Sequence, residues 1–354
     1  MKVLMVVPNI VSGGVDTVVT NLKNGLENSN WKVETISIMP VGERKDINTL
    51  NIKSKFGLGL AILRFFIFVR KSKPDLIHAH TVFPIILTLL IKILFFKKIK
   101  IVATEHGTID KETSKKFIYK MFSFLSSHLN QILFVSQTSM KSYVQNKLVD
   151  PKKCFVIYNG IEKVEENNYF NVDPMVRFCY VGRFSQEKNI GLLLNSFLEF
   201  SDRVGINNVN LTMLGDGQLF NEFKNKIEEK KVKNVFLLGF KDNPKDYIKN
   251  CDCLLLSSYT EGLPTVIIEA FSMKKSVIST DCGGVGEMIK NNNFLVKNNN
   301  KSEYVKSLMC FYNMTSDEKK KNGNVNYEIF INNFTLSKMV ENYEIKYQEV
   351  LNDF

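Results

Sequence analysis

The chain has 354 residues, of which 44% are hydrophobic and 23% are charged. This balance is typical of globular proteins and excludes extended disorder, and a chain of this length is expected to form two domains. Its 47 lysines and arginines exceed its 36 aspartates and glutamates, which gives a formal net charge of +11. An anionic partner is therefore expected: a phosphate-bearing ligand, a nucleic acid or an acidic membrane surface.

The cysteines and the apolar stretches bear on where the protein works. The six cysteines form no CxxC pair and no zinc pattern with a histidine. Cys251 and Cys253 are expected on one face of a strand as buried reduced thiols, which fits a cytoplasmic location. The apolar run at the start of the chain ends at Pro8 and is too short for a signal peptide, so it predicts a buried strand. The longest apolar stretch, 82–96, is shorter than the roughly 20 residues of a membrane span, so no transmembrane helix is expected.

Short apolar segments alternate with longer helical ones along the chain, a pattern typical of parallel sheets covered on both faces. In the first half, strands are predicted at 2–7, 32–38, 76–78, 101–104, 131–135 and 155–157. In the second half, strands are predicted at 177–181, 210–214, 235–238, 253–256 and 276–279. Helices are predicted between the strands, including 16–27 and 117–129, and an amphipathic helix is predicted at 336–351.

The polar run 162–174 has no periodicity and separates the two sets of strands, so it is the expected linker. We therefore predict an N-terminal Rossmann-like domain at 1–165 and a C-terminal one at 166–335. The remaining residues, 336–354, are expected to pack back toward the N-terminal domain as a helix.

Ligands of open α/β sheets bind at the carboxyl ends of the strands, so the turns that follow the strands hold the candidate site. The first turn contains Gly13 and Gly14, which permit a sharp turn and close approach of a ligand, but no GxGxxG fingerprint. His78 and His80 end the third strand, and His106 follows the fourth. These side chains are expected to converge and to contact substrate. Structural hydrogen bonding is one alternative, and metal binding with Glu105 as a third ligand is another.

In the second half, Arg183 and Lys188 flank a loop that leads into a helix. Two cations at a helix N-terminus suit a diphosphate, because free N–H groups and the helix dipole add to the side-chain charges. A solvated basic loop is the alternative. The turn around Gly215 follows the next strand and is either a second ligand-facing turn or simply a tight one.

The most specific segment is SSYTEGLPTVIIEAFSM, which follows the strand predicted at 253–256. Glu261 lies in the loop, Pro264 suits the first helical turn, and Glu269 lies about one turn further into the helix. Gly262 allows backbone N–H groups to approach a phosphate, and the two carboxylates can contact different ends of one extended ligand. A second glycine turn, with Gly283, follows the next strand.

In this order, the motifs resemble those of the retaining GT-B glycosyltransferases of family 4, also called glycosyl transferases group 1. The resemblance runs through nearly the full chain and is most specific from Tyr259 to Glu287. Its elements are Gly13-Gly14, the HAH strand end, Glu105-His106-Gly107, Asn159-Gly160-Ile161, Gly182-Arg183, Glu187-Lys188, Gly215-Asp216-Gly217, Glu261 with Glu269, and Gly283-Gly284 with Glu287. It implies an α/β fold of two facing Rossmann-like domains with parallel sheets.

The resemblance also implies roles for the donor-binding residues. Arg183 and Lys188 would neutralise the diphosphate as it departs, and Glu269 would bind the ribose hydroxyls. The donor sugar and phosphates would be held by Glu261 and by the backbone of Gly262, Leu263, Pro264 and Thr265. His106 and the Gly13–Gly14 turn would reach the same sugar, Gly215 would face the ligand, and the nucleobase would lie near Phe240.

The expected activity is transfer of a sugar from a nucleotide diphosphate sugar, with UDP favoured, to a glycan or lipid-linked acceptor in surface polysaccharide assembly. No metal and no cofactor are expected, and the chain has no DxD motif. Three departures from the family pattern loosen the inference of sugar specificity: Glu162, Gly107 and the segment Lys274–Val277. A non-catalytic GT-B partner subunit and a sugar-nucleotide epimerase or phosphorylase are the alternatives, whereas a dehydrogenase lacks its GxGxxG.

The positive charge suggests a further partner. The segment 111–128 is expected to be amphipathic, and it contains most of the helix predicted at 117–129. One side would carry Lys111, Lys115, Lys116 and Lys120, and another side Phe117, Met121, Phe124 and Leu125. Together with the basic end of 56–73, this helix suits peripheral contact with the anionic inner face of the cell membrane. An ordinary core helix is the alternative, and the apolar run 58–69 is expected in the core. No nucleic-acid motif accompanies the charge, so nucleic acid is not an expected partner.

Overall fold

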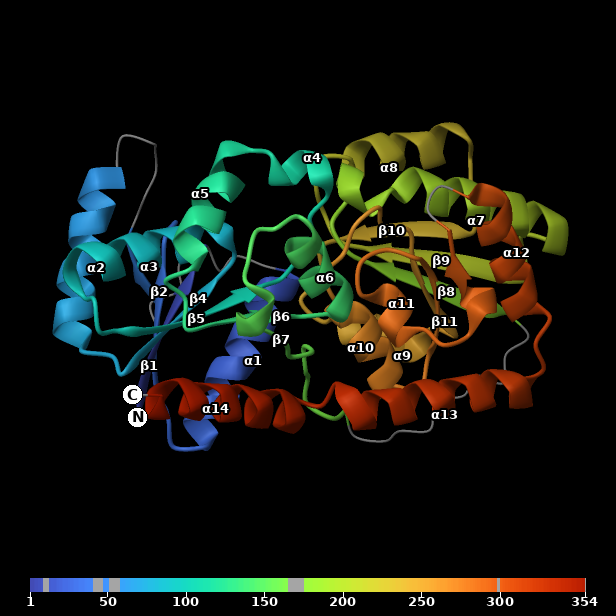
Figure 1. The fold of residues 1–354 in the computed structure, drawn as a ribbon. Coiled ribbons are helices and arrows are strands. Elements are labelled where there is room, and N and C mark those ends of the chain that lie inside the picture. Colours follow the sequence, from blue (N-terminus) through green and yellow to red (C-terminus); the bar gives the residue numbers. More distant parts are fainter. Residues whose placement is uncertain (9–12, 41–46, 51–57, 165–174, 298–299, 354) are drawn as a thin grey trace. The chain divides into compact units, whose positions relative to one another are not determined.

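The computed structural model describes two compact units. The described residues are 1–8, 13–40, 47–50, 58–164, 175–297 and 300–353. Unit 1 comprises Met1–Ile161 together with Leu336–Phe354, and unit 2 comprises Glu162–Thr335. Each unit is built around one parallel sheet (Figure 1). Of the predicted linker 162–174, residues 165–174 lie outside the described part, as do residues 9–12 of the first turn and Phe56.

The sheet of unit 1 has the strand order β3-β2-β1-β4-β5-β6-β7 over the described residues, with every pair parallel. The strands are β1 (Lys2–Val7), β2 (Lys32–Ser37), β3 (Asn48–Thr49), β4 (Leu76–His80), β5 (Lys100–Glu105), β6 (Gln131–Phe134) and β7 (Cys154–Val156). The sequence predicted all of them to within two residues at each end except β3, whose two residues are too short to show a period.

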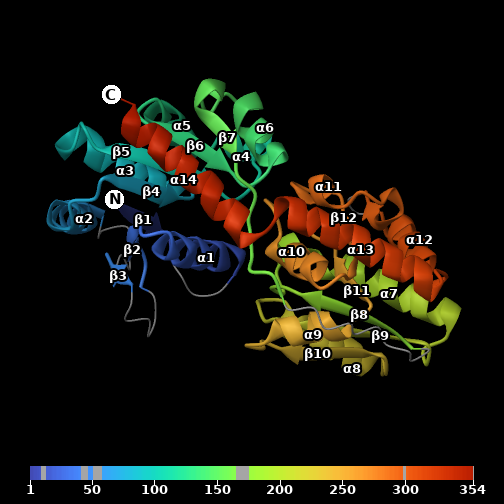
Figure 2. The same ribbon diagram turned by 90° about the horizontal axis from the view of Figure 1, so that it is seen from below.

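Both faces of this sheet are covered, which explains why its strands are almost uniformly apolar. On one face lie α2 (Leu58–Ser72), α3 (Val82–Phe95), α5 (Phe117–Ser126) and α6 (Gln137–Gln145). On the other lie α1 (Gly14–Asn28) and α14 (Leu336–Asn352). Figure 2 shows α14 beside α1, so the last helix of the chain completes the unit that begins it.

The sheet of unit 2 has the order β10-β9-β8-β11-β12-β13 over the described residues, again all parallel. Its strands are β8 (Val176–Val181), β9 (Val209–Leu214), β10 (Val235–Gly239), β11 (Cys253–Leu256), β12 (Ser276–Thr280) and β13 (Leu295–Val296). Its helices include α7 (Ile190–Val204), α8 (Phe220–Glu229), α9 (Pro244–Asn250), α10 (Thr265–Ser272), α11 (Val285–Met288), α12 (Lys301–Tyr312) and α13 (Ser316–Asn333).

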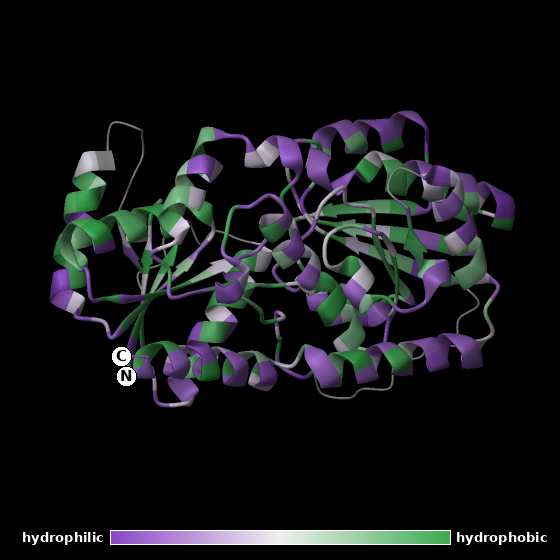
Figure 3. Cartoon of the chain, in the orientation of Figure 1, coloured by the Kyte–Doolittle hydropathy of each residue, from purple (hydrophilic) through white to green (hydrophobic). Residues whose placement is uncertain are grey.

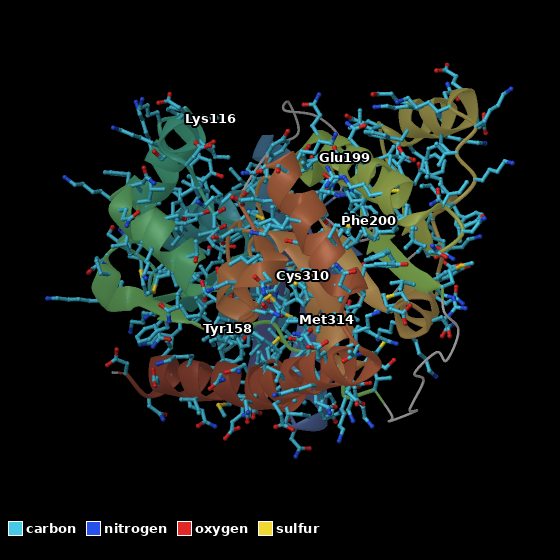
Figure 4. The ribbon with its side chains drawn as sticks, turned by 90° about the vertical axis from the view of Figure 1, so that its right-hand side faces the viewer. Lys116, Tyr158, Glu199, Phe200, Cys310 and Met314 are labelled. Carbon is cyan, nitrogen blue, oxygen red and sulfur yellow. The ribbon has the colours of Figure 1, made fainter. Side chains whose placement is uncertain are left out.

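The packing of α7 shows how helices are held on the sheet of unit 2. Phe200 is fully buried and meets Phe178 of β8 edge-on, with ring centroids 5.7 Å apart. The next residue back, Glu199, points outward and accepts from Lys301 of α12 at 2.6 Å (Figure 4). Adjacent residues of a helix face different directions, so one turn of α7 serves both the core and the surface.

The expectation that two cysteines share a strand face is wrong. Cys251 and Cys253 do not share a strand face, because β11 begins only at Cys253 and Cys251 ends α9. The chain between them is tied down by Asp252, whose carboxylate accepts from the backbone N–H of Arg177 at 2.7 Å. Both thiols are nevertheless buried and free.

The segment 111–128 contains the helix predicted at 117–129, which the structure has as α5 (Phe117–Ser126). It forms α4 (Lys111–Ser114) and α5, with Lys116 in extended conformation between them. In α5 the side facing the sheet carries Phe122 and Leu125, so Phe117 and Phe124 point to solvent and are each 78% exposed. The prediction that Phe117, Phe124 and Leu125 share a side is therefore wrong.

The run 58–69 is also only partly core. It begins α2, whose Ala61, Phe65 and Val69 are buried while Leu60 and Leu63 are half exposed. Among the described residues, no helix combines the length and the apolar character needed to cross a bilayer.

Candidate functional site

Unit 2 brings its candidate residues together at the point where the strand order reverses. The chain runs from β8 outward to β9 and β10 and then returns to β11 on the other side of β8. The loops that follow β8 and β11 therefore lie side by side at the carboxyl edge of the sheet, the position at which open α/β sheets bind ligands. Lys188 belongs to the first loop and Glu261 to the second.

Lys188 and Glu261 form an ion pair across these two loops. The Nζ of Lys188 lies 2.5 Å from Oε1 of Glu261, and the side chains are 20% and 12% exposed. Ser258 donates to the same carboxylate oxygen at 2.6 Å, and Ser257 donates to the backbone carbonyl of Lys188 at 2.8 Å. A charge this far from water needs a charged partner and further hydrogen bonds. The site therefore holds its ammonium group in a fixed position.

Arg183 is positioned differently from Lys188. Its side chain is 70% exposed, and its Nη2 lies 3.3 Å from Oε1 of Glu187. The backbone carbonyl of Glu187 in turn accepts from the N–H of Tyr259 at 2.8 Å, which links this loop to the one that carries Glu261. Such an exposed ion pair is weak, so the guanidinium can exchange Glu187 for an anionic ligand.

Two glycines allow neighbouring turns to approach more closely than any other residue would. Gly215, with φ +126°, follows β9, and a Cβ there would lie 1.9 Å from the carbonyl oxygen of Gly182 after β8. Gly283, with φ +55°, follows β12, and its Cβ would lie 1.8 Å from the carbonyl oxygen of Glu261. The glycine turns predicted from the sequence thus pack directly against the loops that carry Arg183 and Glu261.

The segment after Glu261 leads into α10. Gly262, Leu263 and Pro264 are buried, and Pro264 is the N-cap rather than a residue of the first turn, because the helix begins at Thr265. Gly215 begins the turn that leads from β9 to α8. Phe240 is exposed and directly follows β10, the strand beside β9.

Glu269 lies one turn into α10. Burial raises the pKa of this carboxyl, and Lys245 lowers it in part. Among the described residues its carboxylate forms no hydrogen bond. Its side chain is half-buried, so the carboxylate is accessible and can accept a hydrogen bond from a hydroxyl-bearing ligand.

Unit 1 brings three of its four histidines together, two from β4 and one that directly follows β5. Nδ1 of His80 lies 3.0 Å from Nε2 of His106, and the rings of His78 and His80 are 4.0 Å apart between centroids. Both ring nitrogens of His78 have partners: Nε2 lies 2.7 Å from Oγ1 of Thr104, and Nδ1 lies 2.6 Å from Oη of Tyr347 on α14. His78 therefore has the structural hydrogen-bonding role that was one of the alternatives.

Burial keeps these imidazoles neutral. It lowers the pKa of His78 to about 3 and that of His106 to about 4. His106 is half-buried at the end of β5, and His80 keeps a buried Nε2 that has no hydrogen-bond partner among the described residues. A neutral His106 can donate or accept a hydrogen bond but cannot supply a positive charge at neutral pH.

Glu105 turns away from the histidines. Its Oε2 accepts from Oη of Tyr143 at 3.0 Å, and burial raises its pKa to about 8. Among the described residues, no three His, Cys, Asp or Glu side chains are grouped so that they could hold a metal ion. Glu105 and the histidines therefore do not form the three-ligand set considered from the sequence.

Gly13 and Gly14 lie at the start of α1, directly after residues 9–12, which the structure does not describe. Gly13 has φ +138°, and a Cβ there would meet no atom of the described residues within 4 Å. In unit 1 the strand order reverses between β1 and β4, so this turn and His80 belong to the two loops that flank the reversal.

The sequence reasoning missed several residues that hold the site. Ser257 and Ser258 are visible only as an ordinary pair of serines after a strand. Tyr343 and Tyr347 come from the last helix, more than 200 residues from their partners Thr104 and His78. Only the aromatic character of the predicted helix 336–351 hinted at them.

The sequence matches two family models that together span both units. The model described as Glycosyltransferase Family 4 matches residues 12–164, and the model described as Glycosyl transferases group 1 matches residues 163–327. The chain belongs to glycosyltransferase family 4. Its fold of two Rossmann-like units, each with a parallel sheet, is the GT-B fold predicted from the sequence motifs.

Individual proteins agree with this assignment. The capsular polysaccharide biosynthesis glycosyltransferase CapH of Staphylococcus aureus is 31% identical over 250 residues, which cover 66% of each chain. A Campylobacter jejuni N-acetylgalactosaminyltransferase, named for a diacetylbacillosaminyl-diphospho-undecaprenol acceptor, is 30% identical over 165 residues, 46% of this glycosyltransferase and 44% of that one. The crystal structure of Anabaena HepE in complex with UDP is 15% identical, with TM-score 0.83, and covers 99% of this chain and 100% of that one.

Proposed function

We propose that this glycosyltransferase moves a sugar from a UDP-sugar to a glycan or lipid-linked acceptor, with retention of the anomeric configuration, in the assembly of a surface polysaccharide. The observation that carries the proposal is the Lys188–Glu261 ion pair at the strand-order reversal of unit 2, with the half-buried Glu269 in the following helix. The names of CapH and of the Campylobacter enzyme support polysaccharide assembly and a lipid-linked acceptor.

In this proposal the donor diphosphate lies against the loop after β8. Arg183 releases Glu187 to bind a phosphate oxygen, and Lys188, held in place by Glu261, supplies a second positive charge. The free N–H groups at the start of α10 add to this field. Negative charge builds up on the diphosphate as the glycosidic bond breaks, so these contacts strengthen in the transition state and accelerate the reaction.

The remaining donor contacts follow from the same arrangement. Glu269 accepts hydrogen bonds from the ribose hydroxyls, and Phe240, exposed after β10, lies beside the nucleobase. The backbone of Gly262 to Thr265 holds the donor sugar and phosphates together with Glu261. His106 and the Gly13–Gly14 turn of unit 1 contact the transferred sugar.

Retention follows from a displacement on one face of the sugar. The leaving phosphate oxygen takes the proton of the acceptor hydroxyl, and the transition state resembles an oxocarbenium ion. Arg183 and Lys188 carry the charge neutralisation, so neither a metal ion nor a cofactor takes part.

Nucleotide binding tests the proposal first. Thermal unfolding is measured with UDP, GDP, ADP and NAD, each at about a hundredfold excess over its Kd. A bound nucleotide should add about 2.7 kcal/mol to the free energy of unfolding and raise the Tm by several degrees. We expect the shift with UDP alone. No shift with any diphosphate would favour a non-catalytic subunit, and a shift with NAD alone would contradict the assigned turns.

Two variants then separate binding from chemistry. Glu269→Ala should weaken UDP binding, whereas Arg183→Ala should lower the rate of UDP release from the UDP-sugar by about 10²–10³. Lys230→Ala, at an exposed position after α8, is the matched control and should change neither quantity. Unchanged kinetics in both test variants would refute the assignment.

A further inference from the structure

Unit 1 exposes large apolar side chains on three neighbouring helices. They are Leu60, Leu63 and Ile67 of α2, Leu94 and Phe95 of α3, and Phe117 and Phe124 of α5. All seven are between 50% and 78% exposed. The three helices cover one face of the sheet, and α3 contacts both α2 and α5. We call these seven residues the α2–α3–α5 surface; Figure 3 shows the helices largely in the hydrophobic colour.

The exposure follows from helices that are apolar on both sides. In α2, Ala61, Phe65 and Val69 recur every four residues and face the core. Leu60, Leu63 and Ile67 recur at spacings of three and four on the outer side, where a helix at a water-exposed surface normally carries polar residues. Large apolar side chains exposed on neighbouring helices are typical of an interaction surface.

The charged residues of these three helices have a single sign. The sequences of α2, α3 and α5 contain no aspartate or glutamate. They contribute instead Arg70 and Lys71 at the end of α2 and Lys120, which is exposed on the same side of α5 as Phe117 and Phe124. Lys97 and Lys98, both exposed, directly follow α3. Lys116, exposed at the N-cap of α5, adds a further cation (Figure 4).

The opposite face of the same unit is the natural comparison. There α14 carries Glu341, Glu344 and Glu349 among its lysines, and its single strongly exposed large apolar residue among those described is Ile345. A mixed polar surface of this kind is typical of a helix in contact with water. The helices α2, α3 and α5 therefore differ from α14 in combining exposed apolar side chains with no acidic residue of their own.

We propose that the α2–α3–α5 surface docks on an anionic lipid bilayer. Leucine, isoleucine and phenylalanine side chains enter the boundary between headgroups and acyl chains, while the surrounding lysines and arginines bind the phosphates of the headgroups. A membrane fits these observations better than a second protein, because protein surfaces offer charges of both signs and none of these three helices offers an acid to pair with a cation. The inference goes beyond the proposed reaction and does not rest on it.

Vesicle binding tests the docking surface. The full-length protein is sedimented with vesicles of phosphatidylcholine alone and of phosphatidylcholine mixed with the anionic lipid phosphatidylglycerol. We expect binding to the anionic vesicles only. Phe117→Ser combined with Phe124→Ser should weaken this binding at least about tenfold, and Ile345→Ser, at an exposed apolar position on α14, should leave it unchanged.

Charge is tested separately. Lys116→Glu combined with Lys120→Glu should weaken binding and reduce its dependence on the phosphatidylglycerol fraction, whereas Lys32→Glu, exposed at the start of β2, should not. All these positions are exposed, so the variants should fold, and an unchanged UDP-induced thermal shift checks this. If wild type shows no UDP shift but still binds vesicles, the proposed function fails and the docking surface stands.

Two results would overturn the docking proposal. One is wild-type protein that does not sediment with anionic vesicles. The other is a self-associating protein that the Phe117 and Phe124 substitutions convert to a monomer in analytical ultracentrifugation while vesicle binding stays unchanged. That second outcome would assign the surface to another copy of the chain.

Discussion

Gly283 lies where a side chain would displace the loop that carries Glu261. Its φ of +55° is a left-handed conformation, and an added Cβ would lie 1.8 Å from the carbonyl oxygen of Glu261. The neighbouring N–H of Gly284 donates to the carbonyl of Gly262 at 2.8 Å, so the two loops are tied together at this point. The geometry of the Lys188–Glu261 pair therefore depends on a residue that touches neither of the two side chains.

Gly283→Ala should accordingly lower the free energy of unfolding by about 2 kcal/mol or more and weaken UDP binding, because the loop must move. Urea unfolding and calorimetric titration with UDP measure the two effects. Gly191→Ala is the control: Gly191 lies in α7 with open space where a Cβ would point, so this change should be neutral or stabilising by about 0.5–1 kcal/mol. Equal stability of the two variants would contradict this account.

At the scale of residues, the sequence predicted which loops meet at the edge of the sheet, because strand order determines this. It did not predict the individual hydrogen bonds between side chains. Lys188 and Glu261 each follow a strand, and parallel strands end at a common edge, so their convergence could be expected. The hydrogen bond from Ser258 could not, because serines after strands are common and nothing in the sequence gives their direction. The roles proposed for Arg183 and Glu269 remain predictions.

The last helix shows the limit of local patterns at the scale of elements. Its amphipathic period predicts a packed helix at 336–351, and the structure has α14 at Leu336–Asn352. The period does not reveal that Tyr347 reaches His78 in β4. Long-range pairs of this kind are set by the packing of the whole unit, and a single sequence carries no record of them.

Tyr347→Phe should destabilise unit 1 by about 1–3 kcal/mol, because it leaves the buried Nδ1 of His78 without its partner. The chain has one tryptophan, Trp31, whose ring meets Tyr347 at 5.5 Å and whose Nε1 donates to Glu344 of α14 at 2.8 Å. Its fluorescence during urea unfolding therefore reports on this contact directly.

The matched control is Tyr312→Phe in unit 2, whose hydroxyl forms no hydrogen bond among the described residues. It should leave the transition seen by Trp31 unchanged. A Tyr347 variant as stable as wild type would mean that the hydroxyl contributes nothing to the docking of α14.

The helical period of the segment 111–128 also leaves open which of its side chains face the core. Helical period alone groups Phe117, Phe124 and Leu125 on adjacent positions, but it does not say which of them faces inward. In α5 the inward side is centred on Phe122 and Leu125, because these side chains meet the sheet and α3. When a helix has apolar residues on all sides, the period does not identify the side that faces the core. Tertiary packing determines that side.

At the scale of the whole molecule, buried ionisable groups shape the response to pH. Burial lowers the pKa of His78 to about 3 and of His106 to about 4, so below pH 6.5 the unfolded chain binds protons that the fold rejects. Burial raises the pKa of Glu105 to about 8, so between about pH 4.5 and 8 the fold retains a proton that the unfolded chain has released. Stability should fall on both sides of a maximum near pH 6–7.

The alkaline side can be assigned to one residue. Each proton that only the folded protein retains lowers the free energy of unfolding by up to about 1.4 kcal/mol per pH unit as the pH rises. Glu105→Gln should remove the contribution of this proton, so that stability falls less steeply between pH 6.5 and 8. Unfolding followed by Trp31 fluorescence across this range measures the slope. Glu112→Gln, at an exposed position, should keep the wild-type slope, and an unchanged slope in the Glu105 variant would exclude this residue as the source.

The return of α14 to unit 1 also fixes the order in which the protein can be completed during synthesis. Unit 2 is an insertion: the chain leaves unit 1 at Ile161 and re-enters at Leu336, whose N–H donates to the carbonyl of Ile161 at 2.7 Å. The ribosome therefore releases all of unit 2 before Met339, Tyr343 and Tyr347 can cover the second face of the first sheet. The half of the protein that is translated first is the last to be finished, and until then its α1 face stays open to chaperones.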